Sequence, residues 1–313
     1  MNKIKYSQKN LLFIYIVITI VIVLICNFGK IVNNNYNNTY NLNNETNIIN
    51  KETVDFKNDE LQVLFFYVGQ ADCTLIKYND QTMLIDAGNN EDGNNIADYL
   101  LKQGIKSINY LIGTHSDEDH IGGIDDIINK LDIANFYMPE VGKEEINYKN
   151  AVIAADSKNI KLSYPNKGDK FEIGEVNCEI MSAMKYDNIS DNNSSIVISA
   201  NYKNNKFLFM GDAEKEVENS RSWDKVDVLK VGHHGSNTAS SKEFLEQVSP
   251  KYSVIEVGKN NKYRLPSNKT IERINNVGSK IIRTDINQSS FLMTSDGEEI
   301  STEEIKLNLD GNK

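Results

Sequence analysis

The hydrophobic and polar positions divide the chain into three regions. An uninterrupted apolar run occupies residues 11–26 (LLFIYIVITIVIVLIC), and three lysines precede it without an acidic residue. A helix of this length rises about 24 Å, slightly less than the roughly 30 Å hydrocarbon core of a bilayer, and tilt or local thinning makes up the difference. Residues 1–30 are therefore predicted to form a single-pass membrane anchor, with the N-terminus in the cytoplasm and the rest of the chain outside.

A cleaved signal peptide is the alternative to an anchor. The apolar run is at the long end for a signal peptide, and Cys26-Asn27-Phe28-Gly29 lacks the small-x-small pattern of a cleavage site, so the anchor is preferred. Residues 31–58 are so rich in asparagine that they cannot bury enough apolar surface to fold alone. They are predicted to be a linker.

From Leu61 the pattern becomes regular, and residues 59–313 are predicted to be one globular domain. Short β-type runs alternate with segments that repeat apolar residues at helical spacing. Helices are expected near 96–100, 124–131, 242–248 and 270–277. Strands are expected at 61–68, 74–78, 83–86, 108–112, 195–200, 206–210, 226–231, 253–257, 280–283 and 290–294. Two sheets with helices on their outer faces, an α/β architecture, satisfy this order.

Composition and charge limit the classes of protein to which the chain can belong. Hydrophobic residues make up 40% and charged residues 25% of the chain, as in ordinary globular proteins. The first 30 residues hold four lysines, so the remainder carries 30 basic against 44 acidic residues, a balance of −14. This negative charge disfavours non-specific nucleic-acid binding, which depends on a basic surface. Outside the apolar run, Cys73 and Cys178 lie in strand-like segments and are expected to be buried thiols.

All four histidines fall in two short clusters, THSDEDH and GHHG. In the first cluster, His115 and His120 are five residues apart, a spacing that does not stack on one helix face, so they are expected to wrap a loop at a strand end. Asp117 and Asp119 alternate with them. Imidazole and carboxylate ligands in this arrangement can hold two divalent ions that make hydroxide from water near neutral pH.

The competing interpretation of the first cluster is an acidic, solvated helix cap with incidental histidines. The second cluster, together with Gly211-Asp212 at the end of another predicted strand, favours a metal site. A metal-dependent hydrolase is therefore the leading hypothesis.

The region from Leu61 to about Glu304 resembles the metallo-β-lactamase fold superfamily, and within it the hydrolase domain of ComEC-type competence proteins used in DNA uptake. Seven motifs in the same order carry the resemblance: FFYVGQADCTLI (65–76), MLIDAG (83–88), THSDEDHIGG (114–123), NNSSIVIS (192–199), FLFMGDAE (207–214), LKVGHHGS (229–236) and RTDINQSSFLMTSDG (283–297). The resemblance implies a four-layer αββα sandwich with the metals at one edge of the sheets.

The resemblance also implies a ligand set for two ions. His115 and Asp117 would bind one ion, with Asp117 standing where many members of the superfamily have a second histidine. Asp119, His120 and one histidine of the second cluster would bind the other. Asp212 would bridge both ions.

The sequence leaves the choice between His233 and His234 open, with a slight preference for His233 as the ligand because it comes first after the strand. His234 would then contact the substrate, and Asp119 and His234 are the catalytic candidates. The resemblance places Asp86 behind the metal loop as a brace. Asn193 and Ser195 stand where other members supply a further histidine, so the first ion is expected to be bound weakly.

The ligand set bears on the metal and the substrate. Three carboxylates with three histidines form a harder site than histidines alone, so manganese competes with zinc. Two divalent ions against three aspartates and one hydroxide sum to about zero charge, which suits an anionic phosphodiester better than an amide. Lys259, Lys262 and Arg264 are expected to form a basic rim that holds phosphate, and a solvated loop is the alternative.

The sequence therefore predicts a membrane-anchored, extracytoplasmic metallohydrolase that cleaves phosphoesters, with DNA as the favoured substrate and no stable protein partner. A surface phosphocholine or teichoic-acid-type esterase is the first alternative, because the acidic surface and outward location suit it. A non-catalytic surface binding module that keeps the fold is the second.

Overall fold

The computed structural model describes residues 49–51, 53–186 and 189–309. The predicted anchor at 1–30 lies outside these residues, as does most of the predicted linker at 31–58. Within the described ranges no helix combines the length and the apolar character needed to cross a membrane. The described residues all belong to one compact unit that begins at Ile48.

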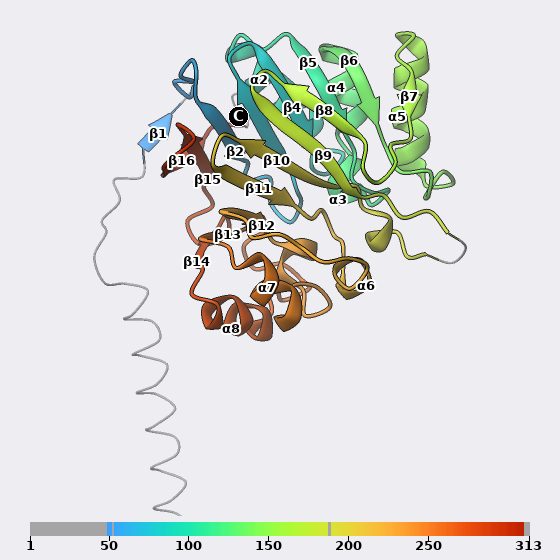
Figure 1. Cartoon of the computed structure of the whole chain (residues 1–313). Coiled ribbons are helices and arrows are strands. Elements are labelled where there is room, and N and C mark those ends of the chain that lie inside the picture. The colour runs from blue at the N-terminus through green and yellow to red at the C-terminus, as the bar shows by residue number, and fades with distance from the viewer. Residues whose placement is uncertain (1–48, 52, 187–188, 310–313) are drawn as a thin grey trace, which may run out of the picture. The chain divides into compact units, whose positions relative to one another are not determined.

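Two β-sheets form the centre of this unit (Figure 1). The first sheet has the strand order β1-β16-β15-β2-β3-β4-β5-β6-β7. Its strands are β1 (Ile49–Lys51), β2 (Leu61–Phe65), β3 (Thr74–Tyr78), β4 (Gln81–Ile85), β5 (Ser107–Ile112), β6 (Asp132–Tyr137), β7 (Leu162–Ser163), β15 (Ser290–Ser295) and β16 (Ile300–Leu307).

The second sheet has the order β14-β13-β12-β11-β10-β9-β8. Its strands are β8 (Lys170–Ile173), β9 (Val176–Ser182), β10 (Val197–Tyr202), β11 (Asn205–Phe209), β12 (Val228–Lys230), β13 (Tyr252–Ile255) and β14 (Lys280–Arg283). The helices are α2 (Gly93–Lys102), α3 (Glu118–Ile121), α4 (Ile124–Lys130), α5 (Ile146–Ser157), α6 (Lys215–Glu218), α7 (Lys242–Val248) and α8 (Asn268–Asn276), with short 3-10 turns η1 (Asn192–Ser194) and η2 (Gly232–Gly235).

Alternation of side chains along the strands explains the layers. On β4, Leu84 points toward α2 and packs in a cluster with Leu100, whereas its neighbour Met83 points toward the second sheet and packs with Phe207. A third apolar cluster joins the outer face of the second sheet to α7 and α8, which lie together against β12 to β14 in Figure 1. The predicted sandwich of two sheets between helical layers is confirmed.

The folded part begins earlier than the composition predicts. Ile49–Lys51 forms β1, which runs parallel to β16, and Val54 is buried in the first core with Phe56 packed against that core. Averaging over the asparagine-rich tract hid these few apolar residues near its end. The prediction of buried thiols is confirmed, because Cys73 and Cys178 are both buried and unpaired.

The topology brings strand ends from both sheets to one edge. In the first sheet β4 and β5 are parallel neighbours, and in the second sheet β11 and β12 are parallel neighbours. Parallel neighbours end at the same edge, so the loops after these four strands meet there. Each predicted metal residue lies in one of these loops.

Candidate metal centre

The first histidine cluster leaves β5 at the sheet edge and turns at once into the short helix α3. His115 and His120 are completely buried, whereas the side chains of Asp117 and Asp119 are 44% and 27% exposed. The turn depends on the glycine that follows: a Cβ on Gly122 would lie 2.5 Å from the backbone nitrogen of Asn90. The sequence therefore packs two imidazoles inward and leaves two carboxylates at the surface of the same loop.

Three imidazole edges face the same space. The Nε2 atoms of His115, His120 and His234 are buried, and within the described residues each lacks a hydrogen-bond partner. His120 Nε2 lies 3.2 Å from Asp212 Oδ1, and His234 Nε2 lies 3.2 Å from Asp119 Oδ2. Unpartnered buried nitrogens facing carboxylates are costly unless a cation joins them.

These residues are of the types and spacing that hold divalent metal ions. The ligand atoms of His115, His120 and Asp212 lie within 4.8 Å of one another, and so do those of Asp119, His120 and His234. The two groups share His120 and therefore overlap. Asp117 is more peripheral, with Oδ2 3.6 Å from His115 Nε2. Bound ions of this kind would supply Lewis acidity and an activated water.

The two histidines of the second cluster lie in different surroundings. Both His233 and His234 have left-handed backbone angles, with φ of 49° and 47°, and this double turn after β12 directs His234 inward. His234 is 2% exposed and belongs to the cluster. The side chain of His233 is 26% exposed, and its Nδ1 lies 3.0 Å from Glu214. The Nε2 atoms of both histidines lie 3.7 Å from Asp212 Oδ2, but only His234 is buried with the other residues of the cluster.

Asp86 lies behind His120, where the resemblance placed it. Its carboxylate accepts hydrogen bonds from the Thr114 backbone N–H at 2.7 Å and the Thr114 hydroxyl at 2.8 Å, and lies 2.8 Å from His120 Nδ1. This contact fixes the Nδ1–H tautomer and leaves Nε2 free for a metal.

Asn193 and Ser195 lie beside the cluster and not in it. The Ser195 hydroxyl accepts a hydrogen bond from the Asp212 backbone N–H at 3.1 Å and lies 3.5 Å from His115 Nδ1. The Asn193 side-chain oxygen accepts a hydrogen bond from the Glu214 backbone N–H, and its side-chain nitrogen donates one to the Glu216 carboxylate. Both side chains therefore support the loops that hold His115 and Asp212.

Three buried residues of the site were not predicted: Asp72, Lys230 and Glu256, each at most 3% exposed. Lys230 Nζ lies 2.6 Å from Asp72 Oδ2, and the Glu256 backbone carbonyl accepts from His234 Nδ1 at 2.9 Å. A lysine at the end of an apolar strand was the available signal, because lysine is rarely buried without a partner.

Electrostatics in the cluster favour cations. Burial by itself would lower the pKa values of His120 and His234, but Asp212 and neighbouring carboxylates outweigh burial and raise both well above the usual value. Burial would likewise raise the pKa of Asp212, but these histidines hold it well below its usual range. A divalent ion would replace the protons that the histidines otherwise attract.

The loop that carries the predicted basic rim is hydrogen-bonded to the segment of the second histidine cluster. Lys259, Lys262 and Arg264 are exposed. Their loop ends where the Ser267 backbone N–H donates to the Gly235 carbonyl at 2.9 Å, one residue after His234. The structure therefore anchors this loop next to the cluster, with its cationic side chains at the surface.

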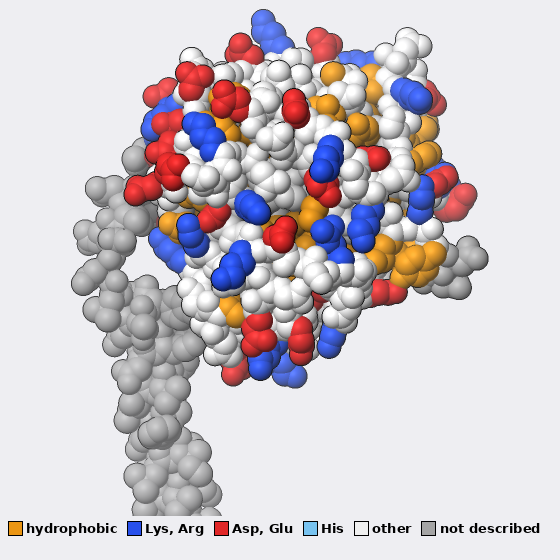
Figure 2. Space-filling view, in the orientation of Figure 1, with side chains coloured by type: hydrophobic (Ala, Val, Ile, Leu, Met, Phe, Trp, Pro, Cys, Tyr) orange, Lys and Arg blue, Asp and Glu red, His pale blue; other side chains and the backbone are white. Residues whose placement is uncertain are grey.

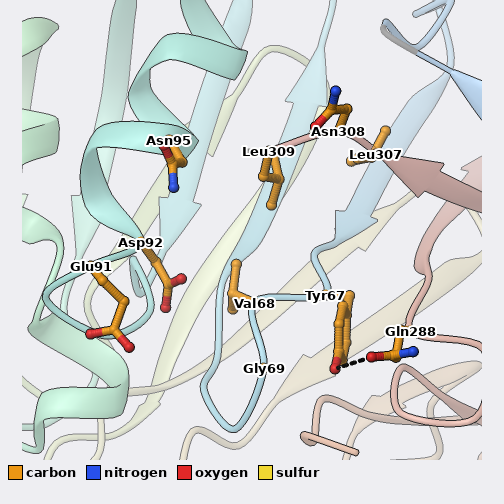
Figure 3. A pocket seen from close by; sticks show the side chains of 10 residues that line it. All are labelled: Tyr67, Val68, Gly69, Glu91, Asp92, Asn95, Gln288, Leu307, Asn308 and Leu309. Atoms are coloured by element: carbon orange, nitrogen blue, oxygen red, sulfur yellow. Dashed lines mark hydrogen bonds between the residues drawn. The ribbon is translucent and has the colours of Figure 1, made fainter. Parts of the chain in front are cut away.

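A pocket of about 430 Å³ that contains none of the cluster residues lies between the β2–β3 loop and the start of α2 (Figure 3). Tyr67 faces it from that loop, and Glu91 and Asp92 line it from the start of α2. None of the histidines lines it, and it contains no lysine or arginine. Its carboxylates make it unsuited to a phosphate group.

Comparison with known proteins defines the family. A model of the metallo-beta-lactamase superfamily matches residues 66–258, and the chain therefore belongs to that superfamily. It is 33% identical over 193 residues to ComE operon protein 3 of Bacillus subtilis, covering 60% of this chain and 25% of that protein. It is 31% identical over 224 residues to Recombination protein 2 of Haemophilus influenzae, covering 69% of this chain and 27% of that protein. The chain thus matches only about a quarter of each relative's length.

Solved structures agree on the fold. The metallo-beta-lactamase fold protein YhfI from Bacillus subtilis superposes with a TM-score of 0.51 at 10% identity, covering 75% of this chain and 100% of that chain. CmlA, a diiron beta-hydroxylase from Streptomyces venezuelae, also superposes with a TM-score of 0.51. The identity is 12%, and the match covers 77% of this chain and 55% of that chain. At these identities the likeness concerns the fold alone.

The two adjacent histidines offer a matched test of the ligand set. We expect His234→Ala to lose about one of two bound divalent ions and to lower hydrolysis by at least about 100-fold, because a cluster ligand is removed. His233→Ala should keep both ions. Metal content per chain after reconstitution and dialysis measures this, and the opposite pattern in the two variants would contradict the assignment.

The raised histidine pKa values predict a pH dependence of stability. A histidine whose pKa is higher in the folded than in the unfolded protein stabilises the fold when it is protonated. This stabilisation is complete below the unfolded pKa of about 6.5, and it is lost as the pH rises through the folded pKa. The metal-free protein should therefore lose thermal stability as the pH rises above about 6.5. The metal-loaded protein should not, because ions replace the protons. Melting curves from pH 6 to 9 would refute this if the metal-free protein gained stability over that range.

Proposed function

We propose that this chain is a metal-dependent phosphodiesterase with DNA as its favoured substrate. The observation that supports it best is the group of three buried, unpartnered Nε2 atoms facing Asp119 and Asp212. Asp117, Asp119, Asp212 and the histidines would hold divalent ions there, which would supply Lewis acidity, and their carboxylates would offset the charge of the ions enough for the site to accept an anionic phosphodiester.

The side chains have separate roles in this proposal. Asp212 presents Oδ1 toward His120 and Oδ2 toward His234, at 3.2 and 3.7 Å, so one carboxylate can bridge two ions. His233 is partly exposed at the edge of the cluster. In this proposal His233, and not His234 as expected from the sequence, contacts the substrate. Arg264 and Lys262 would contact the phosphate backbone outside the cluster.

DNA is favoured because the resemblance is to competence-type hydrolase domains. The face shown in Figure 2 carries acidic and basic side chains side by side and no continuous basic track. Non-specific adhesion to long duplexes is therefore a poor fit for this face. A strand held at the metal cluster and its adjoining loop is consistent with both observations.

A phosphocholine-type esterase is the second candidate, and the acidic pocket favours it. The Tyr67 ring, Glu91 and Asp92 line a pocket whose aromatic and acidic side chains suit a quaternary ammonium group (Figure 3). A non-catalytic binding module is disfavoured, because such a module has no need of a buried cluster whose nitrogens require cations.

We also propose that residues 1–30 anchor the protein in the cell membrane with the hydrolase domain outside. The lysine-flanked apolar run supports this topology. Cleavage of the domain by external protease in intact cells tests it, and complete protection would contradict it.

A substrate panel tests the activity. With manganese or zinc, we expect the protein to hydrolyse bis-p-nitrophenyl phosphate and oligonucleotides at least about 100-fold faster than a β-lactam, because developing phosphoryl charge needs both ions. Arg264→Ala should raise KM several-fold with little change in kcat, as expected for a contact made equally in ground and transition states. Lys106→Ala is the control, since Lys106 is exposed at the opposite end of β5.

The outcomes separate the candidates. Selective hydrolysis of p-nitrophenyl phosphorylcholine, weakened by Glu91→Gln, would favour the esterase over the nuclease. Efficient β-lactam hydrolysis with phosphodiesters untouched would contradict both.

A further inference from the structure

We propose that Asp72 and Lys230 form a buried charge pair that positions His234 for metal binding, as Asp86 does for His120. The inference rests on the metal site of the proposed function and on no particular substrate. Asp72 comes from the β2–β3 loop and Lys230 from the end of β12, so the pair joins the two sheets at the site edge.

The Asp72 carboxylate faces the Nδ1 edges of two imidazoles, whereas their Nε2 edges face Asp119 and Asp212. Asp72 Oδ1 is 3.1 Å from His234 Nδ1, and Asp72 Oδ2 is 3.8 Å from His120 Nδ1. The Nδ1–H of His234 is directed to the Glu256 carbonyl, and among the residues that the structure describes none donates a hydrogen bond to Asp72 Oδ1. A buried carboxylate oxygen without a donor makes sense where an imidazole becomes more positive when its other nitrogen binds a metal.

The backbone of Asp72 holds this carboxylate in place. Its N–H donates to the Asp119 carbonyl at 3.0 Å, and its carbonyl accepts from the Gly88 N–H at 3.0 Å. One residue therefore connects the first ligand loop, the loop after β4 and the second histidine cluster. Movement of Asp72 would disturb ligands on both sides of the site.

Lys230 balances the charge of Asp72. Its side chain is 3% exposed, and its Nζ contacts Asp72 Oδ2 at 2.6 Å and the Val231 carbonyl at 3.1 Å. The neighbourhood already contains the buried carboxylates of Asp86, Asp212 and Glu256. A further buried carboxylate without a cation would be strongly unfavourable. The ammonium therefore allows a carboxylate to sit behind His234 without weakening the fold.

A purely structural salt bridge is the alternative to a positioning pair. Buried ion pairs often contribute little net stability compared with apolar replacements, so burial alone does not explain this one. The two interpretations differ in what is lost. A positioning pair affects metal affinity, and a structural pair affects only the stability of the metal-free protein.

The experiment compares Asp72→Asn, Lys230→Met and the double variant in the full-length protein. The affinities for Mn²⁺ and Zn²⁺ are measured by competition with a chelating dye, and the metal-free proteins are melted in parallel. We expect each single variant to bind at least one ion about 10- to 100-fold more weakly, the usual effect of removing a partner behind a metal-bound histidine. The double variant should bind no more weakly than Asp72→Asn, because Lys230 acts through Asp72.

Lys251→Met is the matched control, since it removes a lysine from a surface pair with Asp227 at 2.8 Å. It should leave both affinities unchanged. If Lys230→Met fails to fold, the nearly isosteric Asp72→Asn decides the question. Unchanged affinities in Asp72→Asn would overturn the proposal. Normal metal binding without phosphodiester hydrolysis in the unmodified protein would instead contradict the proposed function and leave this inference intact.

Discussion

Negative charge concentrated at one edge of the sandwich is the constraint on which the rest of the site depends. Asp72, Asp86, Asp212 and Glu256 are all nearly inaccessible to solvent, and Asp119 adjoins them. Burying so many carboxylates is possible only if cations are present beside them. The structure supplies one through Lys230, and the remaining charge is matched by histidines whose Nε2 atoms face inward. Protons on these histidines, or divalent ions in their place, would balance that charge.

Much of the fold and part of the site could be predicted from the sequence. Histidines and aspartates close together in the chain revealed the first cluster, because local spacing is visible without a structure. The network of Asp72, Lys230 and His234 was not predictable in this way, since 158 residues separate Asp72 from Lys230 and only the meeting of two sheets brings them together. Distance in sequence hides such contacts even when each residue lies inside a recognised motif.

Backbone conformation explains why the two histidines of the second cluster face different surroundings. The order of His233 and His234 after β12 suggested that the first would face the metals, as it would if the chain continued extended. Two consecutive left-handed residues turn the chain, so the second faces inward. The segment 132–182, where no element was predicted, shows another limit. There α5 leaves Ile146 and Ile153 exposed, and so lacks a clear apolar face.

The fold does not determine the reaction, because a diiron beta-hydroxylase superposes on this chain as well as another metallo-beta-lactamase fold protein does. A pair of metal ions between the three buried histidines would distinguish this site. It can be located by anomalous diffraction at the absorption edge of manganese or zinc, from crystals grown with that metal. We expect two peaks bounded by the Nε2 atoms of His115, His120 and His234, with Asp212 between them. Peaks that involve His233 in place of His234, or none at the cluster, would contradict it.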